Sequence, residues 1–136
     1  MKMNTDNKIA LLIDGDNAQP RFISSVLTEA ERLGVVIVKR IYGDWTTDQL
    51  LSWKHKLMQH SIKPVQKFAV GKGKNSTDTA IIIDAMDLLH SKKVNGFCIM
   101  SSDSDYTGLA QRIREEGMFV MGVGESRKTN TVFVKS

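Results

Sequence analysis

The stretch that decides the fold is KIALLIDGDN, residues 8–17, an apolar run that stops abruptly at a cluster of polar residues. A short apolar run bounded by turn-forming residues is typical of a strand buried inside a parallel sheet. Apolar residues then recur at helical spacing over 20–33, and Gly34 is expected to end that helix. A β-branched run over 35–42 predicts the next strand.

The same alternation of strand and helix continues along the rest of the chain. We expect further helices over 47–60, 77–90 and 106–116, and further strands over 62–70, 96–101, 118–123 and 131–134. The inner face of the 47–60 helix is expected to carry Leu50, Leu51, Trp53, Lys54, Leu57 and Met58. Repeated strand–helix–strand units predict an α/β fold, a three-layer αβα sandwich with a central parallel sheet.

Length and composition indicate one cytoplasmic domain. The chain has 136 residues, of which 41% are hydrophobic and 25% charged, as in ordinary globular proteins. We expect a flexible tail over 1–7 and one domain over 8–136. The single cysteine, Cys98, has no partner for an internal disulfide, which suits a reducing compartment. The apolar run over 9–13 is too short for a signal peptide or a membrane span, so we expect cytoplasmic localisation.

The net charge of +4 carries information only through the distribution of the acids. Several aspartates gather at predicted strand ends, so the remaining surface is more basic than the total indicates. A local acidic pocket in a basic surface suits a metal-dependent enzyme with a polyanionic substrate. A charge that serves only solubility explains the total equally well.

Acidic residues follow two predicted strands at the point where each strand ends. Asp14 and Asp16 follow the first strand, and Asp103 and Asp105 follow the 96–101 strand. Ligands of parallel sheets bind outside the carboxyl ends of the strands, where these side chains would meet. Like charges placed close together are costly unless a cation compensates them, and a hard divalent cation suits carboxylate ligands. No cysteine and histidine pair has the spacing of a zinc site.

Asp78 is a third acidic element, in the first turn of the predicted 77–90 helix. It shares one helical stripe with the apolar residues Ile81, Ile82 and Ala85. We therefore expect Asp78 to face the same edge of the sheet as the other acids. Asp84 and Asp87 lie on a different stripe and are expected to face solvent.

Each acid also has an ordinary structural interpretation. Asp16 or Asn17 could cap the helix that begins near residue 20, and Asp103 could cap the 106–116 helix. Asp78 could be an acid that the helix dipole favours in a first turn. A cap explains one aspartate at a site but not two in alternation, so the pair of Asp103 and Asp105 favours a functional site.

Four segments, taken together and in order, resemble the NYN-domain family, and in particular its bacterial LabA-like branch. They are Leu-Leu-Ile-Asp14-Gly-Asp-Asn17, Tyr42-Gly-Asp-Trp45, Lys74-Asn-Ser-Thr-Asp78 and Ser101-x-Asp103-x-Asp105-Tyr106. The resemblance runs from about residue 8 to the end of the chain. Members of that family commonly continue past the final strand, so we leave open that the sequence is truncated at Ser136.

The resemblance implies a PIN-like nuclease with strand order 3-2-1-4-5 and an acidic pocket that binds Mg²⁺ or Mn²⁺. Its acidic residues match Asp14, Asp78, Asp103 and Asp105, and its asparagine matches Asn17. Asp16 matches no invariant acid of the family and is kept as a secondary residue. The substrate implied is RNA, most simply single-stranded RNA, and a homodimer is left open.

These interpretations combine into one hypothesis for the site. Asp14, Asp103 and Asp105 hold one or two metal ions, and Asp78 completes the site or orients the attacking water. The carboxylates are oriented by residues that do not themselves bind the metal, namely Asn17, Ser101 and secondarily Asp16.

Substrate contacts are expected from a glycine-rich loop and from aromatic residues near strand ends. Lys72 and Lys74 in the 71–74 loop could approach phosphates, because glycine allows close backbone approach and lysine supplies charge. Tyr106, with Tyr42 and Trp45, could stack on bases, although aromatic residues more often lie in the core.

Two other classes of protein fit part of the pattern. A phosphatase of the haloacid-dehalogenase type also begins with Asp-x-Asp after a strand, but that motif requires Thr or Val where this chain has Ala18. A regulatory or RNA-binding module could keep the metal pocket without catalysis, because ligands of a structural metal and of a catalytic metal look alike.

Overall fold

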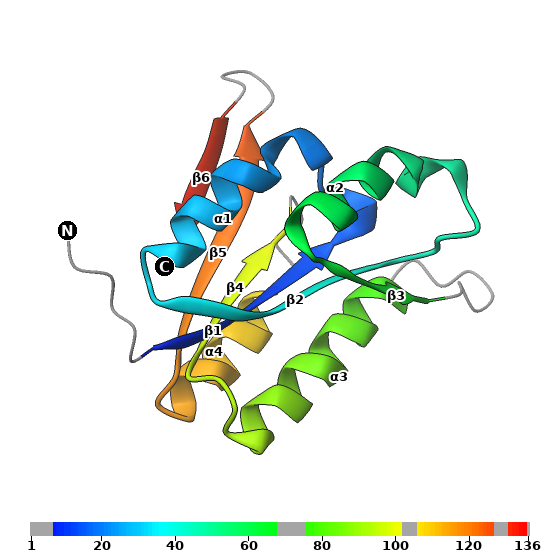
Figure 1. Ribbon diagram of the computed structural model, residues 1–136. Coiled ribbons are helices and arrows are strands. Elements are labelled where there is room, and N and C mark those ends of the chain that lie inside the picture. The colour runs from blue at the N-terminus through cyan, green and yellow to red at the C-terminus, as the bar shows by residue number, and fades with distance from the viewer. Residues whose placement is uncertain (1–6, 68–75, 102–105, 127–130, 136) are drawn as a thin grey trace.

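The computed structural model describes residues 7–67, 76–101, 106–126 and 131–135. Its strands form one six-stranded sheet in the order β3-β2-β1-β4-β5-β6 (Figure 1). They are β1 Lys8–Asp14, β2 Val35–Gly43, β3 Lys63–Gln66, β4 Gly96–Met100, β5 Phe119–Ser126 and β6 Thr131–Lys135. The first five strands are parallel in the expected order 3-2-1-4-5, and β6 pairs antiparallel with β5. The predicted fold class is confirmed.

Helices cover both faces of the sheet, which completes the three layers (Figure 1). The α-helices are α1 Ile23–Glu31, α2 Lys54–His60, α3 Ser76–Ser91 and α4 Thr107–Glu115. Three short 3₁₀ helices precede α1 and α2: η1 Gly15–Asn17, η2 Pro20–Phe22 and η3 Asp48–Trp53. One hydrophobic core lies under α1, η3 and α2, and a second lies under α3 and α4.

The central strand β1 contributes side chains to both cores, which explains its unbroken apolar sequence. Ile9, Leu11 and Ile13 belong to the core under α1, while Ala10 and Leu12 belong to the core under α3. All five side chains are 0% exposed. Burial of each large aliphatic side chain stabilises the fold by about 1.5–3 kcal/mol, so β1 anchors the whole sheet.

The segment 47–60 is helical as predicted, but the expected inner face is wrong. Leu51 and Met58 are 53% and 86% exposed, whereas Leu50 and Trp53 are 1% exposed. For Leu51 the reason is that 48–53 forms a 3₁₀ helix, whose three residues per turn place positions 50 and 53 on one side and Leu51 off it. The α-helical spacing assumed from the sequence therefore applies only to the second half of the segment.

The N-terminal tail and the edge strand β3 differ from their sequence-based boundaries. Residues 1–6 of the expected tail lie outside the described residues, and Asn7 already bonds to the domain through the Leu33 carbonyl. β3 pairs only with 40–43 of β2, so 35–39 has no outer neighbour within the described strands. In the described part of the chain, no helix has the length and apolar character needed to cross a lipid bilayer.

Candidate active site

The strand β1 delivers Asp14 to the carboxyl edge of the sheet. Asp14 pairs in register with Tyr42 of β2, and the preceding Ile13 pairs with Met100 of β4. The carboxylate therefore lies at the topological switch point, where the strand order reverses between β1 and β4. This is the usual ligand position of such folds. Asp14 is 0% exposed, and among the described residues it is the one charged side chain that is buried.

The turn after β1 brings Asn17 back onto Asp14. A Cβ atom on Gly15 would lie 2.7 Å from the carbonyl oxygen of Tyr42, so only glycine allows the chain to turn this closely against β2. The turn continues as η1, and the Asn17 amide donates a hydrogen bond to Oδ2 of Asp14 at 2.9 Å. Asn17 was expected to orient a carboxylate, and this is its contact.

Two further donors reach the same carboxylate oxygen from the other side. The Ser101 hydroxyl, directly after β4, donates to Oδ2 of Asp14 at 2.9 Å, and the Tyr106 hydroxyl lies 3.4 Å from it. The Ser101 backbone is itself fixed, since its N–H donates to the Val123 carbonyl. Hydrogen bonds to a charged acceptor contribute about 1.5–3 kcal/mol each, so together they offset much of the cost of burying this carboxylate.

Tyr106 has a different position from the one expected for a base-stacking residue. It is 7% exposed and packs in the core under α3 and α4, with its hydroxyl directed at Asp14. A ring buried in this way leaves little face for a nucleobase. The sequence pattern did not indicate that Tyr106 supports Asp14, because that contact spans 92 positions of the chain.

The structure places the remaining predicted residues only in part. Asp78 is the third residue of α3, whose N-terminal end lies at the carboxyl edge of the sheet (Figure 1), but its side chain is outside the described part. The side chain of Asp16 is half-buried and lies against the backbone of Gly43. Asp103, Asp105, Lys72 and Lys74 lie outside the described residues.

The chemistry of the Asp14 environment fits a hard divalent cation. A carboxylate oxygen is a ligand that Mg²⁺ and Mn²⁺ prefer, and hydrogen bonds to a ligating carboxylate fix its plane. Within the described residues no three acidic, histidine or cysteine side chains gather, so the other ligands stay predictions.

Asp84, expected to face solvent, instead connects α3 to the sheet. Its Oδ2 accepts hydrogen bonds from the Tyr42 hydroxyl at 2.7 Å and from Arg40 at 3.1 Å. Burial, and then the hydrogen bond to Asp84, raise the pKa of Tyr42 above its usual value. Tyr42 is 0% exposed, so the idea that it stacks on a base is wrong, and its ring is part of the core.

The turn after β2 is held by its own hydrogen bonds. Asp44 accepts bonds from the Thr46 hydroxyl, the Gln66 amide and the Thr46 backbone, and these lower the pKa of its carboxyl group. The Trp45 indole donates to the Val65 carbonyl at 3.2 Å. This segment therefore ties β2 to β3 and supports the edge of the sheet beside Asp14.

Comparison with protein families shows to which family this chain belongs. The family model described as NYN domain matches residues 8–136, nearly the whole chain. The chain belongs to the NYN-domain family. This family has the PIN-like nuclease fold, and the match removes the haloacid-dehalogenase interpretation. The LabA-like branch within the NYN family stays a prediction.

A solved structure agrees with the NYN fold. It is the crystal structure of a protein of unknown function from Vibrio parahaemolyticus, with a TM-score of 0.69 and 19% sequence identity. The similarity covers 96% of this chain and 88% of that chain. At this identity the likeness supports the fold alone. None of the curated proteins compared with the chain matches it.

Proposed function

We propose that this NYN domain is a metal-dependent ribonuclease that hydrolyses phosphodiester bonds in RNA at the carboxyl edge of the sheet. The observation that carries the proposal is Asp14, fully buried and bonded through one oxygen to Asn17, Ser101 and Tyr106. A buried charge is costly, and three donors that converge on it are typical of a site where its position matters. The family supplies the nuclease class.

In this proposal the aspartates divide into ligands and a water-orienting residue. Asp14, Asp103 and Asp105 would hold Mg²⁺ or Mn²⁺, and the bound ion would supply the Lewis acidity that polarises the phosphate and lowers the pKa of a water. Asp78, at the N-terminal end of α3, completes the site or orients the attacking water. Asp16, beside Gly43, has at most a supporting role.

The other residues of the site act on the aspartates or on the substrate. Asn17, Ser101 and Tyr106 hold the plane of the Asp14 carboxylate, so that no reorganisation is needed when substrate binds. Lys72 and Lys74 contact substrate phosphates. The expected substrate is single-stranded RNA, whose phosphates the excess of lysine and arginine over acid would attract.

The proposal is tested by cleavage of end-labelled single-stranded RNA with Mg²⁺ or Mn²⁺, with and without excess chelator. Asp103→Asn and Asp78→Asn should abolish cleavage, and circular dichroism should show that both variants fold. Asp87→Asn is the matched control, because Asp87 is an exposed acid on α3 away from the sheet edge. Cleavage that survives chelator and both variants contradicts the proposal. A folded, metal-binding protein that cuts no RNA points instead to a non-catalytic RNA-binding module.

A further inference from the structure

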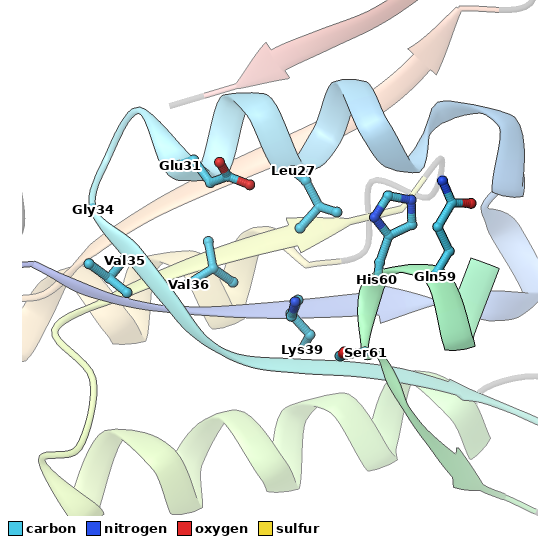
Figure 2. A pocket seen from close by; sticks show the side chains of 9 residues that line it. All are labelled: Leu27, Glu31, Gly34, Val35, Val36, Lys39, Gln59, His60 and Ser61. Carbon is cyan, nitrogen blue, oxygen red and sulfur yellow. The ribbon is translucent and has the colours of Figure 1, made fainter. Parts of the chain in front are cut away.

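A cavity of about 390 Å³ lies on the face of the sheet that carries α1 and α2. Figure 2 shows the side chains around it: Leu27 and Glu31 from α1, Val35, Val36 and Lys39 from β2, and Gln59, His60 and Ser61 from the end of α2, with Gly34 at the turn. Small-molecule sites have volumes of about 300–1,000 Å³, so the cavity has room for a ligand of mononucleotide size.

The cavity is separate from the acidic edge of the sheet. Of the β2 residues that line the cavity, Lys39 is the nearest to the carboxyl edge. It pairs with Leu11 of β1, three positions before the pair of Tyr42 and Asp14. A strand rises about 3.3 Å per residue, so Lys39 lies about 10 Å from the level of Asp14. Val35, at the other end of the cavity, is farther still from that edge.

Three polar side chains of the cavity have no hydrogen-bond or ion-pair partner among the described residues. Within the described ranges, neither Lys39, Gln59 nor His60 makes a side-chain hydrogen bond or ion pair. The Nε2 atom of His60 is buried and lacks a hydrogen-bond partner there. Buried polar groups in folded proteins are nearly always bonded to protein or to water, so this imidazole nitrogen, on a residue that lines the cavity, is a donor or acceptor that a bound ligand could use.

Positive charge gathers at the His60 end of the cavity. Burial lowers the pKa of His60 first, and the nearby charges of Lys56 and Lys39 lower it further. The acid of the cavity, Glu31, is exposed on α1 and is not among the charges that act on His60. Lys39 is half-buried and forms no ion pair with an acid of the described residues, so its ammonium is available to a bound anion.

We propose that this cavity binds a phosphate group between Lys39 and His60. The Lys39 ammonium supplies the charge, and His60 donates its Nε2–H to a phosphate oxygen after a rotation of the ring that turns this buried atom toward the cavity. The aliphatic wall of Leu27, Val35 and Val36 contacts the rest of the ligand. The phosphate belongs either to a small phosphomonoester or to the backbone of an RNA chain that extends from the carboxyl edge.

The local backbone keeps His60 in place for this contact. α2 ends at Ser61, which has a left-handed conformation with φ of 56° and donates its N–H to the Leu57 carbonyl. This turn leads directly into β3, so the position of His60 is fixed by the pairing of β3 with β2. The backbone that carries His60 is therefore fixed before the ligand binds, and only the ring has to turn.

The test follows the His60 ring signals by NMR in the full chain, with excess chelator so that no RNA is cut. Probes are inorganic phosphate, adenosine 5′-monophosphate, adenosine as the phosphate-free control, and a short single-stranded RNA. Phosphate and the monophosphate should shift the His60 signals and raise the pKa of His60, while adenosine should not. If the His60 signals shift with the RNA but not with the two small phosphates, the bound phosphate belongs to an RNA backbone.

Two variants make the site assignment specific. Lys39→Gln should weaken binding of the probe by about tenfold or more, the usual effect of losing one charge-assisted hydrogen bond. Lys54→Gln removes the same charge from an exposed position of α2 outside the cavity and should leave binding unchanged. The proposal would be overturned if Lys39→Gln and Lys54→Gln bound the phosphate probe with equal affinity. It would also be overturned if the His60 signals responded to no phosphate probe. Because no turnover is measured, its failure would leave the nuclease proposal untouched.

Discussion

Two polar regions of the same sheet differ in whether the protein itself supplies their partners. At the carboxyl edge, Asp14 is fully buried and receives hydrogen bonds from Asn17, Ser101 and Tyr106. In the cavity beside β2, Lys39 and His60 make no side-chain contact with a partner in the described chain. One region is assembled by the fold, and the other is complete only with a ligand.

The difference has an energetic meaning. The donors around Asp14 come from three separate segments of the chain, namely η1, the residue after β4 and the residue before α4, so folding itself fixes the geometry of the carboxylate and stabilises it. Lys39 and His60 gain nothing comparable from folding, because burial lowers the pKa of His60 and no acid of the described residues forms an ion pair with either side chain. Substitutions should therefore lower both activity and stability at the first region, and mainly ligand binding at the second.

The largest expected effect concerns metal binding at Asp14. Changes to residues that only support a metal ligand reduce affinity by about 10–100-fold, so Asp14→Asn, which removes a ligand charge, should exceed that range for Mn²⁺. Calorimetric titration of Mn²⁺ into the folded variant measures it, with Asp87→Asn as the control. Equal Mn²⁺ affinity in the wild-type protein and Asp14→Asn would remove Asp14 from the metal site.

The donors to Asp14 should show a graded effect on RNA cleavage. Ser101→Ala removes a 2.9 Å hydrogen bond and should slow single-turnover cleavage by about 10–100-fold. Tyr106→Phe removes a longer contact of 3.4 Å and should slow cleavage less. Rates are compared at saturating Mn²⁺. A larger loss for Tyr106→Phe than for Ser101→Ala would contradict the geometry.

Chemical denaturation should separate the two regions by stability. Ser101→Ala should lower the free energy of unfolding by about 1–2 kcal/mol, because buried Asp14 loses a donor. Lys39→Met should change it by no more than about 0.5 kcal/mol, or raise it, since Lys39 has no partner within the described residues. A large loss for Lys39→Met would mean that the protein itself stabilises the cavity lysine.

The smallest effect is a pH dependence from His60. The folded protein lowers the pKa of His60 below 6.5, so the unfolded chain binds the proton more readily. Stability from this group is complete above pH 6.5 and is lost as the pH falls through the lowered value. His60→Gln should therefore flatten the stability curve on the acid side of pH 6.5, measured by denaturant melts at several pH values. An unchanged curve would mean that His60 titrates normally.

The sequence predicted the sheet well because its signals are local. The apolar run before Asp14, the stop at Gly34, and the helical spacing over 77–90 depend on neighbours along the chain. The position of Asp14 at the carboxyl edge follows from the topology alone. Its contact with Asn17, three residues away, was also within reach of sequence reasoning.

Contacts that join distant elements were not predictable in the same way. Asp84 was expected to face solvent, yet it pairs with Arg40 and Tyr42 across 44 and 42 positions of the chain. The exposure of Leu51 depends on η3 being a 3₁₀ helix, for which hydrophobic spacing gave no indication. The cavity lies between two helix ends and a strand, so no sequence motif marks it.

The most direct test of the central claim is the single-turnover cleavage rate of Asp14→Asn on single-stranded RNA with saturating Mn²⁺. Wild type and Lys39→Gln are measured beside it, each checked for folding by circular dichroism. If Asp14 lies in a catalytic metal site, cleavage by Asp14→Asn falls to the level seen with chelator, while Lys39→Gln still cuts RNA when the protein is in saturating excess over the RNA. Cleavage by folded Asp14→Asn at the wild-type rate would contradict the assignment of this carboxylate to the active site.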